Sequence, residues 1–375
     1  MQVAMEREQG EILSAQVQIE GNLATDRDQP SGKLGFDALA SFSQLSKKQA
    51  SCATLTGMEI RNVAIIGVGA VGCLFGASIN DALGKDHVQV VASGSRLARY
   101  RSQGMFLNGK LVDFDYVEPE HLRVADLVIL ATKNLQLEEA KEQIAKAVGP
   151  DTAILSLLNG TDSEEILARR YGAEHVLYAF AVGMSSEHSG NHIDFTSAGQ
   201  IVFGEKDNSK SPRVLAIEDL FGRSGIAYTV PADIRQAQWK KFMLNTAFNT
   251  LSAITWSGYG DFTQPALLQL VRDVSSEVIA VAKAEGVELT EAMCEENIKT
   301  IGSLDRNGMT SMFQDMVAGR KTENEYFTGT VVRLGEKHRI PTPVCRVLHL
   351  VAQACEGSRS RAVREKIVRD SETKR

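Results

Sequence analysis

A lysine and two asparagines stand four residues apart in the stretch "WKKFMLNTAFNT". They are Lys241, Asn245 and Asn249. Side chains at this spacing lie above one another on a helix, so the three share one face. An ammonium group can donate a proton to a reacting oxygen, and amides can orient substrate oxygens without adding charge. The row therefore predicts a catalytic face, with a solvated helix surface as the alternative.

Apolar residues surround this row, and a charge buried among them needs a partner. The apolar neighbours are Phe242, Leu244, Ala247, Phe248 and Leu251. A buried ammonium is costly unless it is paired or meets an anion. Glu323, in "GRKTENEY", is the expected partner of Lys241, and we expect it on a later helix that covers residues 311–337.

A glycine-rich turn follows the first strongly apolar run, residues 63–66, and precedes a helical pattern. Its glycines have GxGxxG spacing, which in this context predicts a dinucleotide-binding turn. The first permits a tight turn, the second lets a pyrophosphate approach, and the third lets helix and strand pack closely. The predicted cofactor contacts are Gly67, Val68, Gly69, Ala70, Val71 and Gly72.

The end of the second predicted strand, residues 87–93, indicates which dinucleotide binds. NAD-binding versions carry an acidic residue there for the ribose hydroxyls, but this chain has "SGSRLARYR". Ser93, Ser95 and Arg96 suit a 2′-phosphate, which an acid would repel. We therefore predict NADPH (NADP+) as the cofactor, while solvation of a helix face is the alternative role for Arg96.

Two further polar residues follow apolar strands. Lys133 follows "ADLVILAT" and Asn159 follows "TAILSLL". Strands that alternate with helices form a parallel sheet, and ligands gather at the carboxyl ends of its strands. Both residues are therefore expected to point toward the cofactor crevice, although a lysine after a strand is often only a solvated loop residue.

The order of the patterns predicts an α/β fold with two domains. Residues 58–231 form a Rossmann-type NADP-binding domain, with an antiparallel addition at the sheet edge over residues 175–205. Residues 232–358 form an all-α substrate domain whose first helix covers residues 234–256, and the active site lies in the cleft between the domains. Residues 1–57 are expected to be a disordered extension, with Met58 as an alternative start, and residues 359–375 a charged tail.

Composition narrows the class of protein. The chain has 375 residues and a net charge of −6, so no overall basic field favours nucleic acid or a membrane surface. The five cysteines have no zinc-like spacing, and no metal site is predicted. The apolar runs are too short to span a membrane. These features favour a cytoplasmic protein that binds a small molecule.

Taken together, these motifs resemble the ketopantoate reductase (2-dehydropantoate 2-reductase) family. The resemblance covers nearly all of residues 58–356 and rests on "GVGAVG", "ATKNLQLEEA", "LLNG", "QWKKFMLNTAFNTLSAIT" and "TSMFQDMVAGRKTENEY". The glycine motif is shared by many dinucleotide enzymes. The lysine helix and the later "SMFQD" to "RKTE" segment are much more specific.

The resemblance implies a role for each matching residue. Lys241 would be the general acid, Glu323 would bind both the substrate and the cofactor, and Asn245 and Asn249 would line the site. Ser311 would contact the substrate carboxylate. By the same resemblance, Asn159 would lie between cofactor and substrate and Lys133 would touch the cofactor. The implied reaction is NADPH-dependent reduction of 2-dehydropantoate to (R)-pantoate, toward pantothenate and coenzyme A.

Three departures from the family pattern keep other functions open. Thr250, Glu325 and Cys345 stand where the family often has proline, aspartate and asparagine. One alternative is a related reductase of a different 2-oxo acid. The other is a regulator that binds NADPH without turnover, although such a protein would have little reason to keep the full polar set. A homodimer is the expected assembly.

Overall fold

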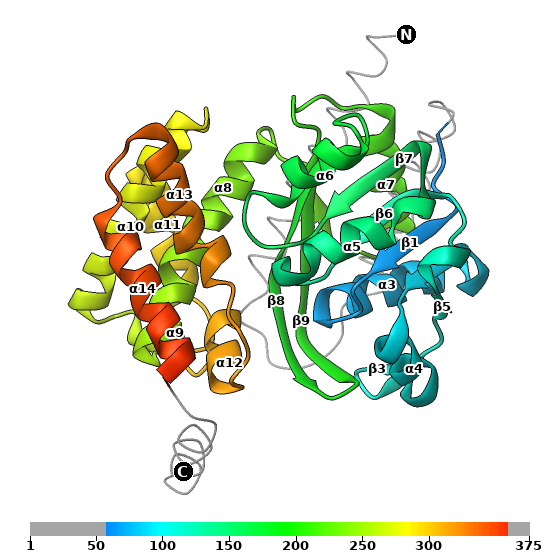
Figure 1. The fold of residues 1–375 in the computed structure, drawn as a ribbon, viewed down its shortest axis with the longest axis horizontal. Helices are drawn as coiled ribbons and strands as arrows, with labels where there is room; N and C mark the ends of the chain where they lie inside the picture. The colour runs from blue at the N-terminus through cyan, green and yellow to red at the C-terminus, as the bar shows by residue number, and fades with distance from the viewer. Residues whose placement is uncertain (1–57, 359–375) are drawn as a thin grey trace, which may run out of the picture. The chain divides into compact units, whose positions relative to one another are not determined.

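A parallel sheet forms the centre of the first part of the chain (Figure 1). The computed structural model describes residues 58–358, and within them the parallel strands lie in the order β5, β2, β1, β6, β7, β8. This is the strand order of dinucleotide-binding folds, and the order reverses between β1 and β6. The bounds are β1 (Val63–Ile66), β2 (Val88–Val91), β5 (Asp115–Val117), β6 (Ala125–Leu130), β7 (Val148–Ser156) and β8 (Val176–Ser189).

The predicted antiparallel addition is present but does not end the sheet. Strand β8 pairs antiparallel with β9 (His192–Gly204). Beyond β9, the sheet continues with β3 (Met105–Leu107) and β4 (Lys110–Val112), while β10 (Tyr228–Thr229) also pairs with β9. The position at the edge was therefore wrong, because the segment after α4 (Gly94–Gln103) adds strands beyond the hairpin.

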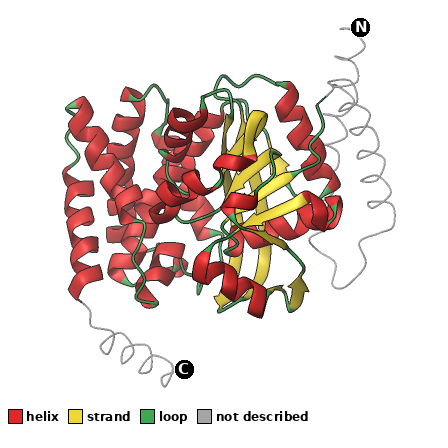
Figure 2. Ribbon diagram, turned by 45° about the vertical axis from the view of Figure 1, so that its right-hand side comes forward, coloured by secondary structure: helices red, strands yellow, loops and turns green. Residues whose placement is uncertain are grey.

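Helices cover both faces of the parallel sheet (Figure 2). Val63 and Ile65 of β1 pack in one core with α3 (Ala70–Leu83) and α7 (Pro212–Arg223), while Ala64 and Ile66 pack in another. The second core includes α5 (Leu137–Gln143) and α6 (Ser163–Tyr171). A strand buried on both faces is a continuous apolar run, which explains the apolar sequence of β1. Short turns of helix are η1 (Lys85–His87), η2 (Pro119–His121), η3 (Asn134–Gln136) and η4 (Ala145–Ala147).

The second part of the described chain is helical and has its own apolar core, which includes Phe242, Phe248 and Phe327. Its first helix begins after Asp233, whose side chain accepts a hydrogen bond from the backbone nitrogen of Gln236. The elements are α8 (Ile234–Leu244), η5 (Asn245–Asn249), α9 (Thr250–Thr255), η6 (Tyr259–Asp261), α10 (Pro265–Ala284), α11 (Glu291–Gly302), α12 (Ser311–Val317), η7 (Asn324–Tyr326), α13 (Thr328–His338) and α14 (Pro343–Ser358).

Two predicted helices are not regular. The helix over residues 234–256 contains a π-helical segment, η5, between α8 and α9, and this segment holds both asparagines of the lysine row. The helix over residues 311–337 is broken, because Gly319 has a φ of +66° and ends the helical path after α12. Glu323 consequently lies in a turn before η7 rather than on a helix.

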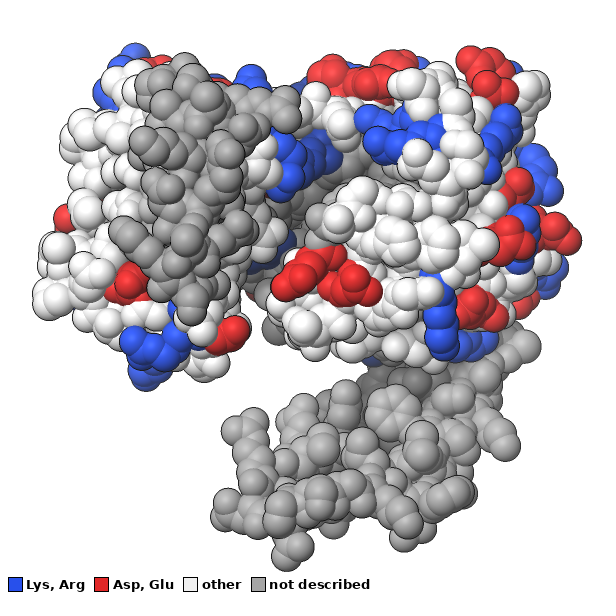
Figure 3. All heavy atoms as spheres, turned by 90° about the horizontal axis from the view of Figure 1, so that it is seen from below, with Lys and Arg blue, Asp and Glu red and all other residues white. Residues whose placement is uncertain are grey.

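The α/β class with a helical second part is confirmed by this architecture. The predicted domain limits at residues 231 and 358 stay predictions, and the expectations for residues 1–57 and 359–375 lie outside the described residues. Within residues 58–358, no helix has the length and apolar character that crossing a membrane requires. Figure 3 shows basic and acidic side chains interspersed on one face of the molecule.

Candidate active site

The glycine turn lies at the carboxyl end of β1, beside the end of β6. Gly67 has a φ of +94°, and a Cβ placed on it would lie 2.7 Å from backbone atoms of Ala131 and Thr132. A Cβ on Gly72 would lie 2.0 Å from the carbonyl oxygen of Gly67. Neither position has room for a side chain, so these two glycines are required by the fold itself.

Gly69 is different, because a Cβ there would meet no protein atom within 4 Å. It precedes α3, whose amino end has no capping side chain and no acidic residue in its first turn. Nearby, the hydroxyl of Thr132 is buried and finds no hydrogen-bond partner within the described part of the chain. Open space, free helical N–H groups and an unpaired hydroxyl fit a phosphate-bearing cofactor. Val68, Ala70 and Val71 lie in the same turn and the start of α3.

The three residues predicted to recognise a 2′-phosphate lie at the start of α4, next to the end of β2. Ser93 is the residue before α4, and its hydroxyl accepts a hydrogen bond from Gln143 Nε2 at 3.1 Å. Ser95 is exposed and Arg96 is half-buried. No ion pair or hydrogen bond of the Arg96 side chain is found in residues 58–358, so its guanidinium is available for a ligand.

Lys133 lies after β6, where its ammonium forms an ion pair with Asp315 of α12. Asp315 also accepts from Arg320 Nε at 2.7 Å, and its side chain is only 2% exposed. The Lys133 side chain is nearly half exposed. A buried carboxylate between two cations is well compensated, and it connects the end of the sheet with the helical part. Asp315 lies in the "SMFQD" segment, but its ion pair with Lys133 was not predicted from the sequence.

Four polar residues from distant segments form one hydrogen-bonded chain. Lys241 Nζ donates to Asn159 Oδ1 at 3.1 Å, and Asn159 Nδ2 donates to Glu323 Oε2 at 3.0 Å. The other carboxylate oxygen, Glu323 Oε1, accepts from Asn134 Nδ2 at 2.9 Å. The expected connection between Lys241 and Glu323 is therefore made through an intervening amide. Asn134 was missed because nothing in its position after Lys133 distinguishes it from a loop residue.

The ammonium of Lys241 is held in a weakly solvated place. Its Nζ atom lies over the Phe180 ring, 5.3 Å from the ring centroid. The face of an aromatic ring attracts a cation at this distance. Burial lowers the pKa of Lys241 to about 8, while the negative charges of Glu323 and Glu164 raise it. A lysine whose pKa is lowered in this way gives up its proton more readily near neutral pH than an ordinary lysine does, which suits proton transfer to a substrate.

The two asparagines of the row are buried within η5, where Asn245 is 9% and Asn249 is 6% exposed. Asn249 Nδ2 lies 3.5 Å from the hydroxyl of Ser311, the first residue of α12. The structure thus brings Ser311 to the row. A π-helical segment widens the backbone turn, and such segments are frequent at functional sites.

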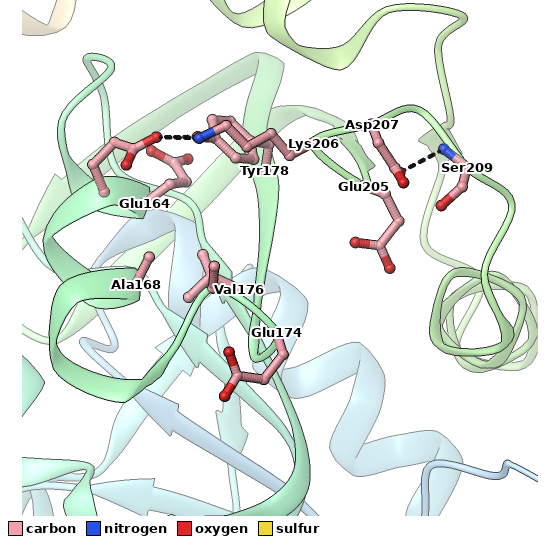
Figure 4. Close-up of a pocket in the computed structure, with 11 residues that line it drawn as sticks. Glu164, Ala168, Glu174, Val176, Tyr178, Glu205, Lys206, Asp207 and Ser209 are labelled. Carbon is pink, nitrogen blue, oxygen red and sulfur yellow. Dashed lines mark hydrogen bonds and ion pairs between the residues drawn. The ribbon is translucent and has the colours of Figure 1, made fainter.

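A separate cavity lies next to α6, β8 and the end of β9 (Figure 4). Two of its carboxylates have charged partners: Glu165 accepts from Lys206 and also from Tyr178, and Glu205 accepts from Arg213. None of the residues predicted for the active site lines it. Its lining residues are Glu164, Glu165, Ala168, Ala173, Glu174, Val176, Tyr178, Glu205, Lys206, Asp207 and Ser209.

The strand order and the glycine turn are those of a dinucleotide-binding protein, and its relatives identify it as an oxidoreductase that uses a nicotinamide dinucleotide and acts on a CH–OH group. Two family models match most of the described chain. Residues 63–208 match the family described as "Ketopantoate reductase PanE/ApbA", and residues 233–356 match "Ketopantoate reductase PanE/ApbA C terminal". The chain belongs to the ketopantoate reductase family.

Individual relatives agree with this assignment. The chain is 28% identical over 301 residues to a 2-dehydropantoate 2-reductase of Vibrio cholerae, covering 80% of this chain and all of that protein. A PanE/ApbA family ketopantoate reductase of Ralstonia eutropha is 29% identical, with a TM-score of 0.69, covering 79% and 98% of the two chains. A D-mandelate dehydrogenase solved with NADH and anilino(oxo)acetate shares the fold at 23% identity and a TM-score of 0.72, again covering 79% and 98%.

Proposed function

We propose that this protein reduces 2-dehydropantoate to (R)-pantoate with NADPH, as a cytoplasmic homodimeric enzyme of pantothenate and coenzyme A synthesis. The observation that supports this function best is the hydrogen-bonded chain from Lys241 through Asn159 to Glu323. It joins an ammonium of lowered pKa on the helical part to the ends of β6 and β7. Asn245 and Asn249 are buried later in the same helical stretch, and Asn249 lies beside Ser311, so we assign these three residues to the same site.

The residues for the cofactor follow from the glycine turn. The N–H groups at the start of α3 would bind the pyrophosphate, with Gly69 leaving room for it. Ser93, Ser95 and Arg96 would bind the 2′-phosphate, and Lys133 and Asn159 would lie along the nicotinamide half. When bound, NADPH supplies the hydride that reduces the ketone carbon.

Lys241 would hold the proton that the ketone oxygen receives. An ammonium aimed at that oxygen stabilises the charge that develops there more strongly than it stabilises the ground state. Its hydrogen bond to Asn159 fixes the direction of the Nζ atom. After proton donation, the neutral amine is tolerated because burial already lowers its pKa.

The other residues of the site would orient the substrate. Asn245 and Asn249 offer amide donors and acceptors without charge, and Ser311 would bind the substrate carboxylate beside Asn249. Glu323 would accept from a substrate hydroxyl while it holds Asn159. Because its oxygens accept from two amides, its charge is partly compensated and repels a substrate carboxylate less.

Glu323→Gln is expected to lower kcat/KM by about 10-fold or more, because it removes a charge and turns an N–H group toward an existing donor. The fall should be visible in both KM and kcat, measured by initial rates with varied substrate. The matched control is Glu325→Gln, since Glu325 lies in the same segment but pairs with Arg333 at the surface. If KM and kcat are unchanged in Glu323→Gln, Glu323 does not bind the substrate.

The preference for NADPH depends on Arg96. Initial rates with each cofactor should give a clear advantage to NADPH, and Arg96→Gln should reduce that advantage by about 10-fold, the effect of losing one charge-assisted contact. Arg99→Gln is the control, because Arg99 instead lies over the ring of Tyr100 at 5.3 Å. Equal efficiency of the wild type with NADH and NADPH would refute this assignment.

A substrate panel tests the function as a whole. Purified protein is mixed with NADPH and ketopantoate or another 2-oxo acid, and the loss of NADPH absorbance is followed. Rapid oxidation with ketopantoate supports the proposal. Turnover only with a different 2-oxo acid would identify a related reductase, and NADPH binding without turnover would identify a regulator.

A further inference from the structure

A buried carboxylate that no predicted role explains lies on α6. Glu164 is only 1% exposed, although it is the second residue of that helix. Ionisable side chains are almost never this deeply buried without a compensating reason. Its two oxygens must therefore have partners within the fold.

The carboxylate of Glu164 accepts hydrogen bonds from several donors of the described chain. Gln238 Nε2 donates to Glu164 Oε1 at 2.7 Å, and Ser163 Oγ donates to Oε2 at 2.9 Å. Ser163 is itself held by the hydroxyl of Ser156, and backbone N–H groups of Glu164 and Ala179 also donate to the carboxylate. Such a set of donors matches an anion, which only accepts. These donors favour the charged form, but they offset the effect of burial only in part.

Gln238 connects this anion with the helix of the active-site lysine. It is itself 2% exposed and stands three residues before Lys241 on α8, so both side chains lie on the same side of the helix. The hydrogen bond from Gln238 therefore holds α8 against α6 one turn before Lys241. Glu164 attracts the ammonium of Lys241 through space.

We propose that Glu164 is a positioning residue whose buried charge, fixed by Gln238, keeps Lys241 protonated until it donates its proton. This proposal rests on the proposed function, because it assumes that Lys241 is the acid. Glu323 on the far side of Asn159 is the second carboxylate that favours the ammonium. The lysine thus lies under the influence of two anions from different parts of the fold.

The pKa values of the pair support this geometry. Burial raises the pKa of Glu164 to about 7, although its hydrogen bonds lower it, and burial lowers the pKa of Lys241 to about 8. Both groups carry their charges where the pH lies above the pKa of Glu164 and below that of Lys241. Other charged groups lie around this pair. The carboxylate of Glu323 raises the pKa of Lys241, and Tyr178 of β8 lies near Glu164. Three further charged residues lie around Tyr178 and form an outer group. The outer group is Glu165, Lys206 and Arg235.

The test compares the pH dependence of kcat/KM in the wild type and Glu164→Gln. Loss of the anion should move the fall of activity at high pH downward by about one pH unit, so that kcat/KM at pH 8 drops roughly fivefold while activity near pH 6 changes little. Glu164→Asp keeps the charge and should keep the wild-type profile. The matched control is Glu165→Gln, the next residue of α6, whose carboxylate accepts from Lys206 and Tyr178 instead.

A purely structural role gives a different result. Glu164→Gln would then lower the melting temperature and the overall rate but leave the high-pH fall where it is in the wild type, and this outcome would overturn the proposal. So would an equal displacement of that fall in Glu165→Gln.

A second measurement does not need turnover. The rate at which Lys241 reacts with acetic anhydride is followed against pH by mass spectrometry, because only the neutral amine reacts. Glu164→Gln should make Lys241 reactive at lower pH than in the wild type. If no 2-oxo acid is reduced but this displacement is present, the proposed function fails while the coupling of the two groups stands; without the displacement, the coupling itself is refuted.

Discussion

Lys241→Met is expected to lower kcat by at least about 10²-fold, the usual contribution of a general acid, while NADPH still binds. Methionine keeps the apolar stem of the side chain but cannot donate a proton. The measurements are steady-state kcat with 2-dehydropantoate and the dissociation constant of NADPH by fluorescence titration. Turnover near that of the wild type would exclude Lys241 as the acid.

The Lys241→Met substitution should not destabilise the folded protein. The pKa of Lys241 lies below its ordinary value of 10.5, so the folded protein disfavours the charged lysine at every pH below about 8, and this penalty disappears only as the pH rises past 10.5. Removing the charge at pH 7 should therefore leave the melting temperature unchanged or higher. Lys240→Met serves as the control, because Lys240 forms an ion pair with Glu296 and should keep normal turnover.

Gly69→Val is expected to weaken NADPH binding by at least about 10-fold without unfolding the protein. Gly69 has a φ of −75°, which any residue can adopt, and no protein atom lies within 4 Å of an added Cβ. The new side chain would occupy only the space that we assign to the pyrophosphate. Titration with NADPH and a melting curve measure the two effects separately.

Gly72→Ala provides the contrast. An added Cβ would lie 2.0 Å from the backbone oxygen of Gly67, so this variant should have a lower melting temperature even without NADPH. Normal NADPH affinity in Gly69→Val would show that the cofactor does not approach this turn.

Much of the fold follows from local sequence patterns. The apolar run of β1, the glycines after it and the alternation of strands with helices are readable from the sequence, because each depends on neighbours in the chain. The break between α12 and α13 was missed, since the apolar spacing continues through it and only the positive φ of Gly319 ends the path. Likewise, a π-helical segment such as η5 leaves no periodic signal that separates it from α8.

The candidate site likewise has features that local sequence predicts and features that depend on the fold. The glycine turn and the presence of Lys241, Asn245 and Asn249 in one helical stretch can be predicted from local patterns, because close spacing decides which side chains share a face. The tertiary structure was needed to show that Asn159 stands between Lys241 and Glu323, and that the charge of Glu164 acts on Lys241. These contacts join residues far apart in the chain, and it is burial in the packed fold that makes their charges and hydrogen bonds matter.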